Sequence, residues 1–273
     1  MSTPITHSGH IYIACAISIA VFGFLATLRV MEVLGIDIGG NNIKANIVNI
    51  SSGAISSEGF KRETPRPASL TALLGVLKEI IAHYDWSGPI GVGFPGVIRD
   101  HTVVSAANLD HSLIGLNIEE ALLDLDAFEA SAINEADAAG IAEMKFGAGR
   151  NEPGSVLMIT IGTGVGTALF YNQTLVPNIE LGHAEYRGLE AEKTLSEKAR
   201  IDSGLTWEHW ARDFNSYLRY LAKLLSIDTI ILGGESATER DEFEKYLSLP
   251  CQYKFAKFGN ESGIIGAALS VDC

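Results

Sequence analysis

The chain has 273 residues, of which 47% are hydrophobic, with 28 glycines and 8 prolines; it can bury a sizeable core as one large domain or as two lobes. Its formal net charge of −13 argues against a surface for nucleic acid or anionic membrane, but leaves room for a local basic pocket for phosphate. The three cysteines, Cys15, Cys251 and Cys273, lie far apart, so neither a disulfide framework nor a cysteine-rich zinc site is expected, as fits a reducing cytoplasm.

The first element in chain order is a stretch of 18 uncharged residues, 11–28, which Arg29 follows. By length it just spans a membrane, and Arg29 would then favour a cytoplasmic body. A signal peptide would carry basic residues before the apolar stretch, and none is present. Since a strand is expected directly after Met31, residues 1–30 also fit a dispensable extension before the true translation start. An anchor, a cleaved signal and a dispensable extension all stay open, and the body is expected in the cytoplasm.

The next elements alternate between strands and helices. Residues 33–62 form three apolar-alternating runs broken by the turns GGNN and SSG, which predicts a β-meander. A helical pattern covers 69–84, and a strand region at 89–98 ends in a Phe-Pro-Gly turn. A second hairpin is expected at 156–171, and a mostly helical region runs from Glu190 to Leu225. The chain closes with a buried strand, DTIILGG, and a small-residue helix, ESGIIGAALS.

Two of these segments are similar to each other in sequence. IDIGGNNIKANIVN (36–49) aligns without gaps with ITIGTGVGTALFYN (159–172), and each reads as an apolar strand, an Ile-Gly turn and a strand that ends in Asn. A repeated hairpin with a glycine turn predicts two similar lobes that face each other.

The glycine run GTGVG (162–166) does not fit a dinucleotide-binding fingerprint, because its spacing is GxGxG and a strand follows it instead of a helix. Glycine-rich hairpin turns still bind phosphate where successive backbone N–H groups converge on one anion. Either turn alone also fits a plain tight hairpin. Two matched turns, the first with Asp37 on its entering strand and Lys44 just after it, favour a phosphate clamp.

The segment INEADAAG (133–140) places Glu135 and Asp137 at an expected helix start, just after Asn134. Such a group can be a helix cap, a metal site or a catalytic base, and a cap by Asn134 is compatible with catalysis by the acid that follows it. The acids and the histidine of ELGHAE (180–185) likewise fit a solvated polar turn, a metal site or a sugar pocket.

Seven motifs in order make the chain from about residue 33 to 270 resemble the ROK group of sugar kinases, and within it most closely the polyphosphate glucokinase branch. They are GIDIGGNNIK (35–44), GVGFPGVI (91–98), AANLD (106–110), INEADAAG (133–140), ITIGTGVGTAL (159–169), VPNIELGHAE (176–185) and IILGG (230–234). The run from VPNIELGHAE through GLEAEK to LTWEHWA indicates the polyphosphate branch. The resemblance implies a two-lobed α/β fold of the actin/hexokinase (RNase H-like) type with duplicated phosphate-binding hairpins. The small lobe is expected at 31–132, with 259–273 returning to it, and the large lobe at 133–258.

The resemblance also implies the chemistry. A phosphoryl group would pass from polyphosphate or ATP, with Mg²⁺, to the 6-hydroxyl of glucose or a similar hexose. The residues implied to line the hexose site are Asn108, Asp110, Asn134, Glu180, His183 and Glu185. Those implied to hold the donor are Asp37, Gly39, Gly40, Asn41, Lys44, Gly162, Thr163, Gly164, Gly166, Gly233 and Gly234. The zinc-binding cysteines that many ROK proteins carry after the equivalent of His183 are missing, so no structural zinc is expected. A homodimer is expected, nucleic acid is not, and membrane contact requires residues 11–28 to be an anchor.

Three positions depart from the family pattern. Glu135 stands where the family has the Asp that deprotonates the attacking 6-hydroxyl; its charge and ordinary pKa are nearly those of Asp. Its extra methylene shifts the carboxylate by on the order of 1 Å, and a misplacement of that size can cost roughly 100-fold in rate. Asn41 replaces the usual Thr or Ser, and its amide can still donate to phosphate. Glu235 replaces a common third glycine, where its charge would repel the donor unless it turns away or meets Mg²⁺.

These departures leave an alternative function open, a catalytically weakened or inactive hexose-binding or regulatory ROK protein. Besides Lys44, the candidate basic contacts for a polyanionic donor are Lys145, Arg150 and Arg187.

Overall fold

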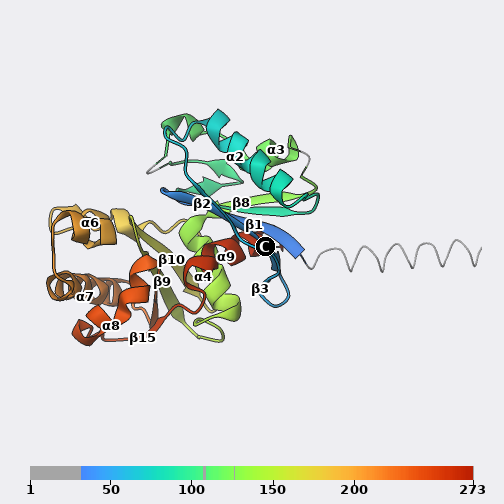
Figure 1. Cartoon of the computed structure of the whole chain (residues 1–273). Coiled ribbons are helices and arrows are strands. Elements are labelled where there is room, and N and C mark those ends of the chain that lie inside the picture. Colours follow the sequence, from blue (N-terminus) through green and yellow to red (C-terminus); the bar gives the residue numbers. More distant parts are fainter. Residues whose placement is uncertain (1–31, 107–108, 126, 273) are drawn as a thin grey trace, which may run out of the picture.

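The computed structural model describes residues 32–106, 109–125 and 127–272. Two sheets with helices around them form two lobes, and two further helices lie between the sheets (Figure 1). The hydrophobic stretch at 11–28, and with it the question of an anchor, a signal or a dispensable extension, lies outside the described residues. Within the described part, no helix combines the length and the apolar character needed to cross a bilayer.

The first sheet has the strand order β3-β2-β1-β5-β8, and β4 also pairs with β2. Its strands are β1 (Glu32–Ile38), β2 (Asn42–Asn49), β3 (Ala54–Ile55), β4 (Phe60–Glu63), β5 (Ile90–Phe94) and β8 (Ala130–Asn134). The hairpin β1–β2 is antiparallel, whereas β1, β5 and β8 run parallel. The expected meander is confirmed over its first two runs. The third run is split into β3 and β4, and between them the Ser57 hydroxyl accepts a hydrogen bond from Ile47 N–H (3.0 Å).

The second sheet has the order β11-β10-β9-β14-β15. Its strands are β9 (Ser155–Ile161), β10 (Val165–Tyr171), β11 (Thr174–Val176), β14 (Thr229–Gly233) and β15 (Gln252–Phe255). The pairs β9–β10 and β10–β11 are antiparallel, whereas β9, β14 and β15 run parallel. Both sheets therefore contain a hairpin whose first strand continues into two parallel strands, with further antiparallel strands on the outer side of the hairpin, and the duplication predicted from the sequence is confirmed.

The two hairpins differ in register by one residue. Ile38 pairs with Ile43 in the first hairpin, but Ile161 pairs with Val165 in the second. The first turn therefore spans 39–42 and the second only 162–164. The gapless alignment of the two segments is right for the entering strand and slips by one residue in the strand that leaves the turn.

Helices cover the outer faces of the sheets, and their apolar sides supply the cores. The predicted helix at 69–84 is α2 (Leu70–His83), which lies with α3 (Ile118–Leu123) over the first sheet. The helical region predicted after Glu190 comprises α5 (Glu192–Leu195), α6 (Glu197–Asp202) and α7 (Trp207–Leu225). Helix α7 packs its fully buried Trp210, Phe214 and Tyr217 against the second sheet.

Short elements connect these layers. They are β6 (Ile98–Arg99), β7 (Thr102–Val103), η1 (His111–Leu113), η2 (Leu181–His183), β12 (Glu185–Tyr186), β13 (Leu189–Glu190), η3 (Glu235–Glu239), α8 (Arg240–Phe243), η4 (Glu244–Tyr246), η5 (Gly259–Glu261) and η6 (Ser270–Asp272).

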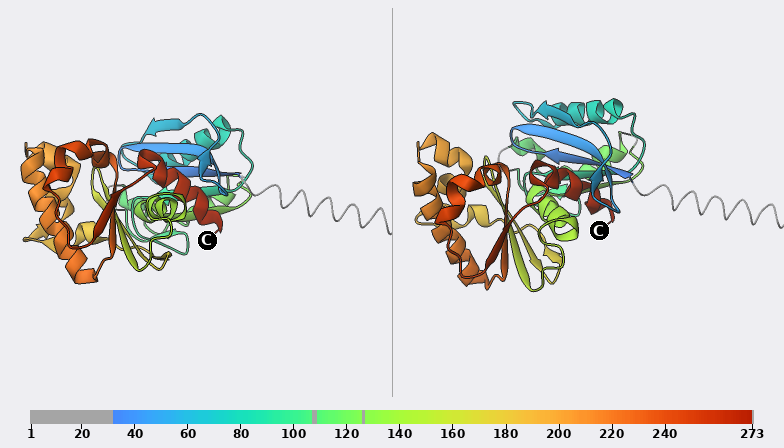
Figure 2. Two further views of the ribbon diagram at one scale, coloured as in Figure 1. Left: turned by 90° about the horizontal axis from the view of Figure 1, so that it is seen from below. Right: turned by 60° about the horizontal axis from the view of Figure 1, so that its bottom comes forward.

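Helices α4 (Glu135–Phe146) and α9 (Ser262–Leu269) lie between the sheets in every view (Figures 1 and 2). The predicted small-residue composition of α9 is what permits this packing. A Cβ at Gly266 would lie 1.6 Å from the carbonyl oxygen of Ala138 on α4, and a Cβ at Gly91 on β5 would lie 1.8 Å from that of Ala267. The C-terminal helix thus returns to the first sheet and packs against α4. The lobe boundaries at 132/133 and 258/259 stay predictions.

Candidate active site

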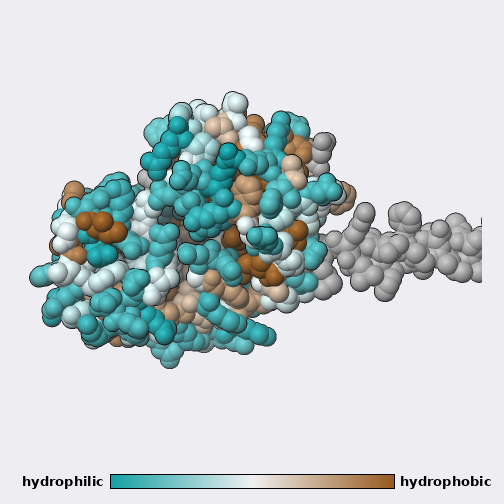
Figure 3. All heavy atoms as spheres, in the orientation of Figure 1, coloured by the Kyte–Doolittle hydropathy of each residue, from teal (hydrophilic) through white to brown (hydrophobic). Residues whose placement is uncertain are grey.

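A cavity of about 220 Å³ lies between the two hairpin turns and the start of α4. The face seen in Figure 3 is mainly hydrophilic and is hollowed between the lobes. The cavity brings together most of the residues that the sequence singled out: Asp37, Gly39, Gly40, Asn41, Lys44, Asn134, Glu135, Gly162, Thr163, Gly164, Gly166, Glu180, His183 and Gly234. Segments about 120 residues apart in the chain, such as Asn41 and Thr163, therefore share one site.

Three singled-out residues lie away from this cavity. Asp110 caps η1 by accepting a hydrogen bond from Ser112 N–H (2.8 Å), and it lines a neighbouring cavity of about 810 Å³. Glu185 is exposed on β12, and Gly233 is buried at the end of β14. Asn108 lies outside the described residues.

The basic residues are also distributed differently from expectation. Of the described residues that line the cavity, Lys44 is the one Lys or Arg. Lys145, Arg150 and Arg187 do not line it, and Arg187 is paired with Asp213 at 2.6 Å on the surface. Arg66, which the sequence analysis did not single out, lies at the first turn and donates to Asn41 Oδ1 (3.0 Å).

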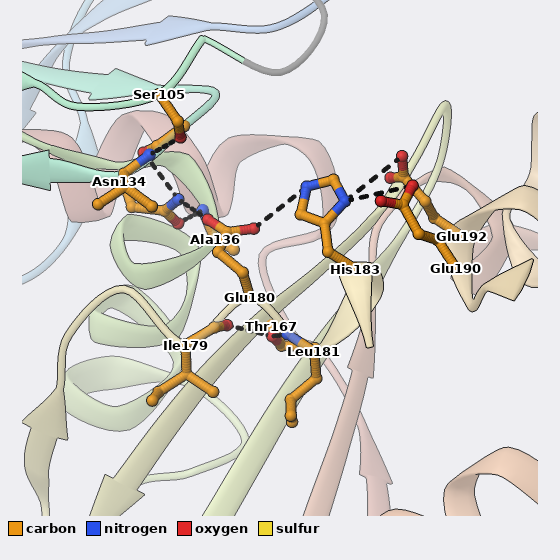
Figure 4. Close-up of polar contacts among 12 residues, drawn as sticks. Ser105, Asn134, Ala136, Thr167, Ile179, Glu180, Leu181, His183, Glu190 and Glu192 are labelled. Carbon is orange, nitrogen blue, oxygen red and sulfur yellow. Dashed lines mark hydrogen bonds and ion pairs between the residues drawn. The ribbon is translucent and has the colours of Figure 1, made fainter. Parts of the chain in front are cut away.

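Asn134 connects three parts of the site: the start of α4, the turn that contains Gly96, and Glu180. Its Oδ1 accepts from the N–H groups of Ala136 (2.8 Å) and Asp137 (3.1 Å), so the predicted cap of α4 is confirmed. Its Nδ2 donates to the carbonyl of Gly96 (3.0 Å) and to Oε1 of Glu180 (2.8 Å; Figure 4). These bonds fix the backbone of Glu135 at the first position of α4 and hold Glu180 beside it.

Glu135 lies among other acids in a partly buried position. Burial, with the charges of Asp37 and Glu180, raises the pKa of Glu135 to about 8, and the charge of Lys44 opposes the rise. Burial also raises the pKa of Asp37 to about 6, again against Lys44, its cross-strand partner in the β1–β2 ladder. A carboxyl group with such a raised pKa can accept a proton in the pH range at and above that value.

A second acidic group surrounds His183 (Figure 4). Its Nε2 lies 3.9 Å from Glu180, and its Nδ1 lies 3.8 Å from Glu190 and 3.9 Å from Glu192. Glu192 also lines the cavity, with a side chain only 13% exposed. Glu192 was not among the site residues predicted from the sequence, and Glu185 was expected instead. The available signal was GLEAEK (188–193), whose second acid, Glu192, opens the short helix α5. Within the described residues, His183, Glu190 and Glu192 form the group that could hold a metal.

The two hairpin turns touch each other across the cleft. Asn41 Nδ2 donates to Thr163 Oγ1 (2.9 Å), so the amide that was expected to face phosphate is engaged with the other turn. Glu235 does not turn away from the site, because its Oε2 lies 3.9 Å from where a Cβ at Gly162 would be. The donor side of the cavity thus carries a negative charge next to the second turn.

Comparisons with known proteins show which family this sequence and fold resemble. A family model described as "ROK family" matches residues 33–192. The chain is similar to a polyphosphate glucokinase of Mycobacterium tuberculosis (strain CDC 1551 / Oshkosh), with 36% identity over 86% of this chain and 89% of the relative. It is similar in structure to an inorganic polyphosphate/ATP-glucomannokinase from Arthrobacter sp. strain KM, with a TM-score of 0.85, 37% identity and coverage of 88% of this chain and 98% of that one. A ROK family glucokinase from Streptomyces griseus, solved with glucose and AMPPNP, shares the fold, with a TM-score of 0.73, 24% identity and coverage of 87% and 98%.

Proposed function

The chain belongs to the ROK family, and from this premise we propose that it is a glucokinase-type enzyme that transfers a phosphoryl group from polyphosphate or ATP to the 6-hydroxyl of glucose. Relatives named polyphosphate glucokinase and polyphosphate/ATP-glucomannokinase support the reaction and both donors. The observation that carries the proposal is one cavity in which Glu135 lies between two glycine-rich turns and the Glu180–His183 segment.

On the sugar side, the hydroxyls of the hexose are held by Asn134, Glu180 and His183, with Glu192 as a further acceptor in place of Glu185. The 6-hydroxyl oxygen attacks the terminal phosphorus of the donor, and its proton passes to the carboxylate of Glu135. The bond from that phosphorus to the bridging oxygen breaks, and the shortened donor leaves. The protein mainly positions the two reactants in such a transfer, and the cap by Asn134 holds the backbone that carries Glu135.

On the donor side, the backbone N–H groups of the turns at 39–42 and 162–164 bind the phosphates, and Lys44 neutralises part of their charge. One lysine faces several carboxylates in this cavity, so the donor requires a counter-ion. Carboxylate and phosphate oxygens suit Mg²⁺. We propose that Asp37 would hold Mg²⁺, and that the ion would supply the charge neutralisation that Lys44 alone does not.

The test is glucose-6-phosphate formation by the purified full chain, with Mg²⁺ and either ATP or polyphosphate. We expect product with at least one donor and none after Mg²⁺ is chelated, whereas glucose binding survives chelation. Glucose binding without transfer from either donor would contradict the proposal. A homodimer and a cytoplasmic location stay proposals, which sedimentation and cell fractionation test.

A further inference from the structure

The side chain of Asn178 joins two segments next to the sugar side of the cavity, the one that carries Gly96 and the one that carries Glu180 and His183. Its Oδ1 accepts from the backbone N–H of Ile98 (2.9 Å), and its Nδ2 donates to the carbonyl of the same residue (2.8 Å). Ile98 opens β6, two residues after Gly96 of the Phe-Pro-Gly turn. Because one side-chain amide bonds both backbone groups of Ile98, it fixes the distance of Asn178 from Ile98 and their relative orientation.

The backbone of Asn178 is held from a third direction by α4. Its N–H donates to Oδ2 of Asp137 at 2.7 Å. Asp137 is fully buried, and its other oxygen, Oδ1, has no partner within the described part of the chain. Burying a carboxylate costs free energy unless hydrogen bonds compensate for it. The bond that the Asp137 side chain accepts from Asn178 N–H is the contact that accounts for an acid at this position.

The same loop carries the sugar-binding candidates. Two residues after Asn178, Glu180 accepts from Asn134 (2.8 Å). On either side of Glu180, the hydroxyl of Thr167 donates to the carbonyl of Ile179 and accepts from Leu181 N–H (3.0 Å), as Figure 4 shows. The loop is therefore tied to β10 by Thr167, to α4 by Asp137 and to β6 by Asn178.

We propose that Asp137 and Asn178 are positioning residues that together form a clasp, which sets Glu180 and His183 at the correct distance from Glu135. The clasp rests on the proposed function, since it positions that sugar site, although neither residue lines the cavity itself. Its loss would let the 178–183 loop move away from the Gly96–Ile98 wall. Because misplacement of about 1 Å can cost roughly 100-fold, a loosened loop should weaken glucose use well before it unfolds the protein.

The test compares Asn178→Gly with Asn172→Gly in the full chain. Both asparagines have left-handed backbones, with φ of 60° and 49°, which glycine adopts freely. Both also use the side chain in hydrogen bonds, since Asn172 accepts from Gly154 N–H (3.0 Å) in a turn that does not line the cavity. We expect Asn178→Gly to raise the KM for glucose by about tenfold or more, with the donor KM within about twofold. Asn172→Gly should leave both constants unchanged.

Amide hydrogen exchange of the ligand-free protein gives a readout that does not depend on catalysis. Exchange over 178–183 should be several-fold faster in Asn178→Gly and unchanged in Asn172→Gly. If the two variants match in exchange or in glucose KM, the clasp is overturned. If the unmodified chain makes no glucose-6-phosphate, the proposed function fails, and the exchange comparison still decides whether the clasp holds the loop.

The contribution of Asp137 is tested by rescue. Asp137→Ala removes the acceptor of Asn178 N–H, whereas Asp137→Asn keeps an oxygen in that place. We expect the alanine variant to resemble Asn178→Gly in glucose KM and the asparagine variant to resemble the unmodified chain. An equal rise of the glucose KM in both variants would overturn the role of Asp137. If the alanine variant does not fold, the asparagine variant is compared with the unmodified chain, and a higher glucose KM in the asparagine variant overturns that role.

Discussion

At the scale of single residues, the site is a set of acids whose proton affinities are raised by burial and by one another. Asp37, Glu135 and Asp137 have pKa values raised to about 6, 8 and 7, in each case with burial as the largest cause. Each of these groups binds a proton more tightly in the folded chain than in the unfolded one. They therefore reduce the free energy of unfolding as the pH rises from about 4 to about 8. The site is maintained at a cost in stability at neutral pH.

The raised pKa of Glu135 makes a prediction about activity. A general base works as the carboxylate, and the pKa of about 8 means that most of it is protonated in the free enzyme below that pH. We expect kcat/KM for glucose to fall by up to tenfold per pH unit below about 8 and to level off above it. A pH profile of kcat/KM at saturating donor measures this. A profile flat from pH 6 to 9 would show that Glu135 does not limit the reaction.

Glu235 makes a prediction about the donor. Its carboxylate faces the turn at Gly162, so neutralising it should strengthen the binding of a polyanion. At an exposed site one charge is worth about 1 kcal/mol, or roughly fivefold. We expect Glu235→Gln to lower the donor KM by about that factor. Glu242→Gln, the same change on exposed α8, is the control; a higher donor KM in Glu235→Gln alone would instead make Glu235 a metal contact.

At the scale of elements, local patterns predicted most strands and helices, because apolar alternation and small-residue runs reflect burial directly. The two sheets could not be predicted in full. Both β3 and β4 pair with β2, and the break between them, where the Ser57 hydroxyl accepts from Ile47 N–H, leaves no mark in the apolar pattern. The one-residue difference between the hairpins depends on turn geometry, which a gapless alignment does not see.

The contact of α9 with α4 gives a prediction about stability. Gly266→Ala would place a methyl group 1.6 Å from the carbonyl oxygen of Ala138, so the helices must separate. We expect a loss of about 1–3 kcal/mol in the free energy of unfolding, with lower turnover because α4 carries Glu135. Gly75→Ala is the matched control, since a Cβ there meets nothing within 4 Å and alanine favours helix by about 1 kcal/mol. Urea unfolding of both variants measures the difference, and equal destabilisation would contradict the packing.

At the scale of the whole molecule, motif resemblance predicted the two-lobed fold and most of the residues that meet in the cleft. It could not predict which members of a polar motif face inward. Glu192 lines the cavity and Glu185 does not, because a short hairpin, β12–β13, reverses the chain between them. Nor could it place the basic residues, since Arg66 reaches the first turn only through the fold of the Pro-rich loop. Contacts between lobes, such as Asn41 with Thr163, carry no local signal in the sequence.

The most direct measurement is glucose-6-phosphate formation by Glu135→Gln in the full chain, made together with its glucose affinity and melting temperature. We expect turnover to fall by about 10²–10⁴-fold, with glucose affinity within about threefold. The melting temperature at pH 8 should be no lower than that of the unmodified chain, because the change removes a charge from a desolvated site. Turnover at the unmodified rate in the folded variant would contradict the assignment of Glu135 as the base that makes this cleft a glucokinase site.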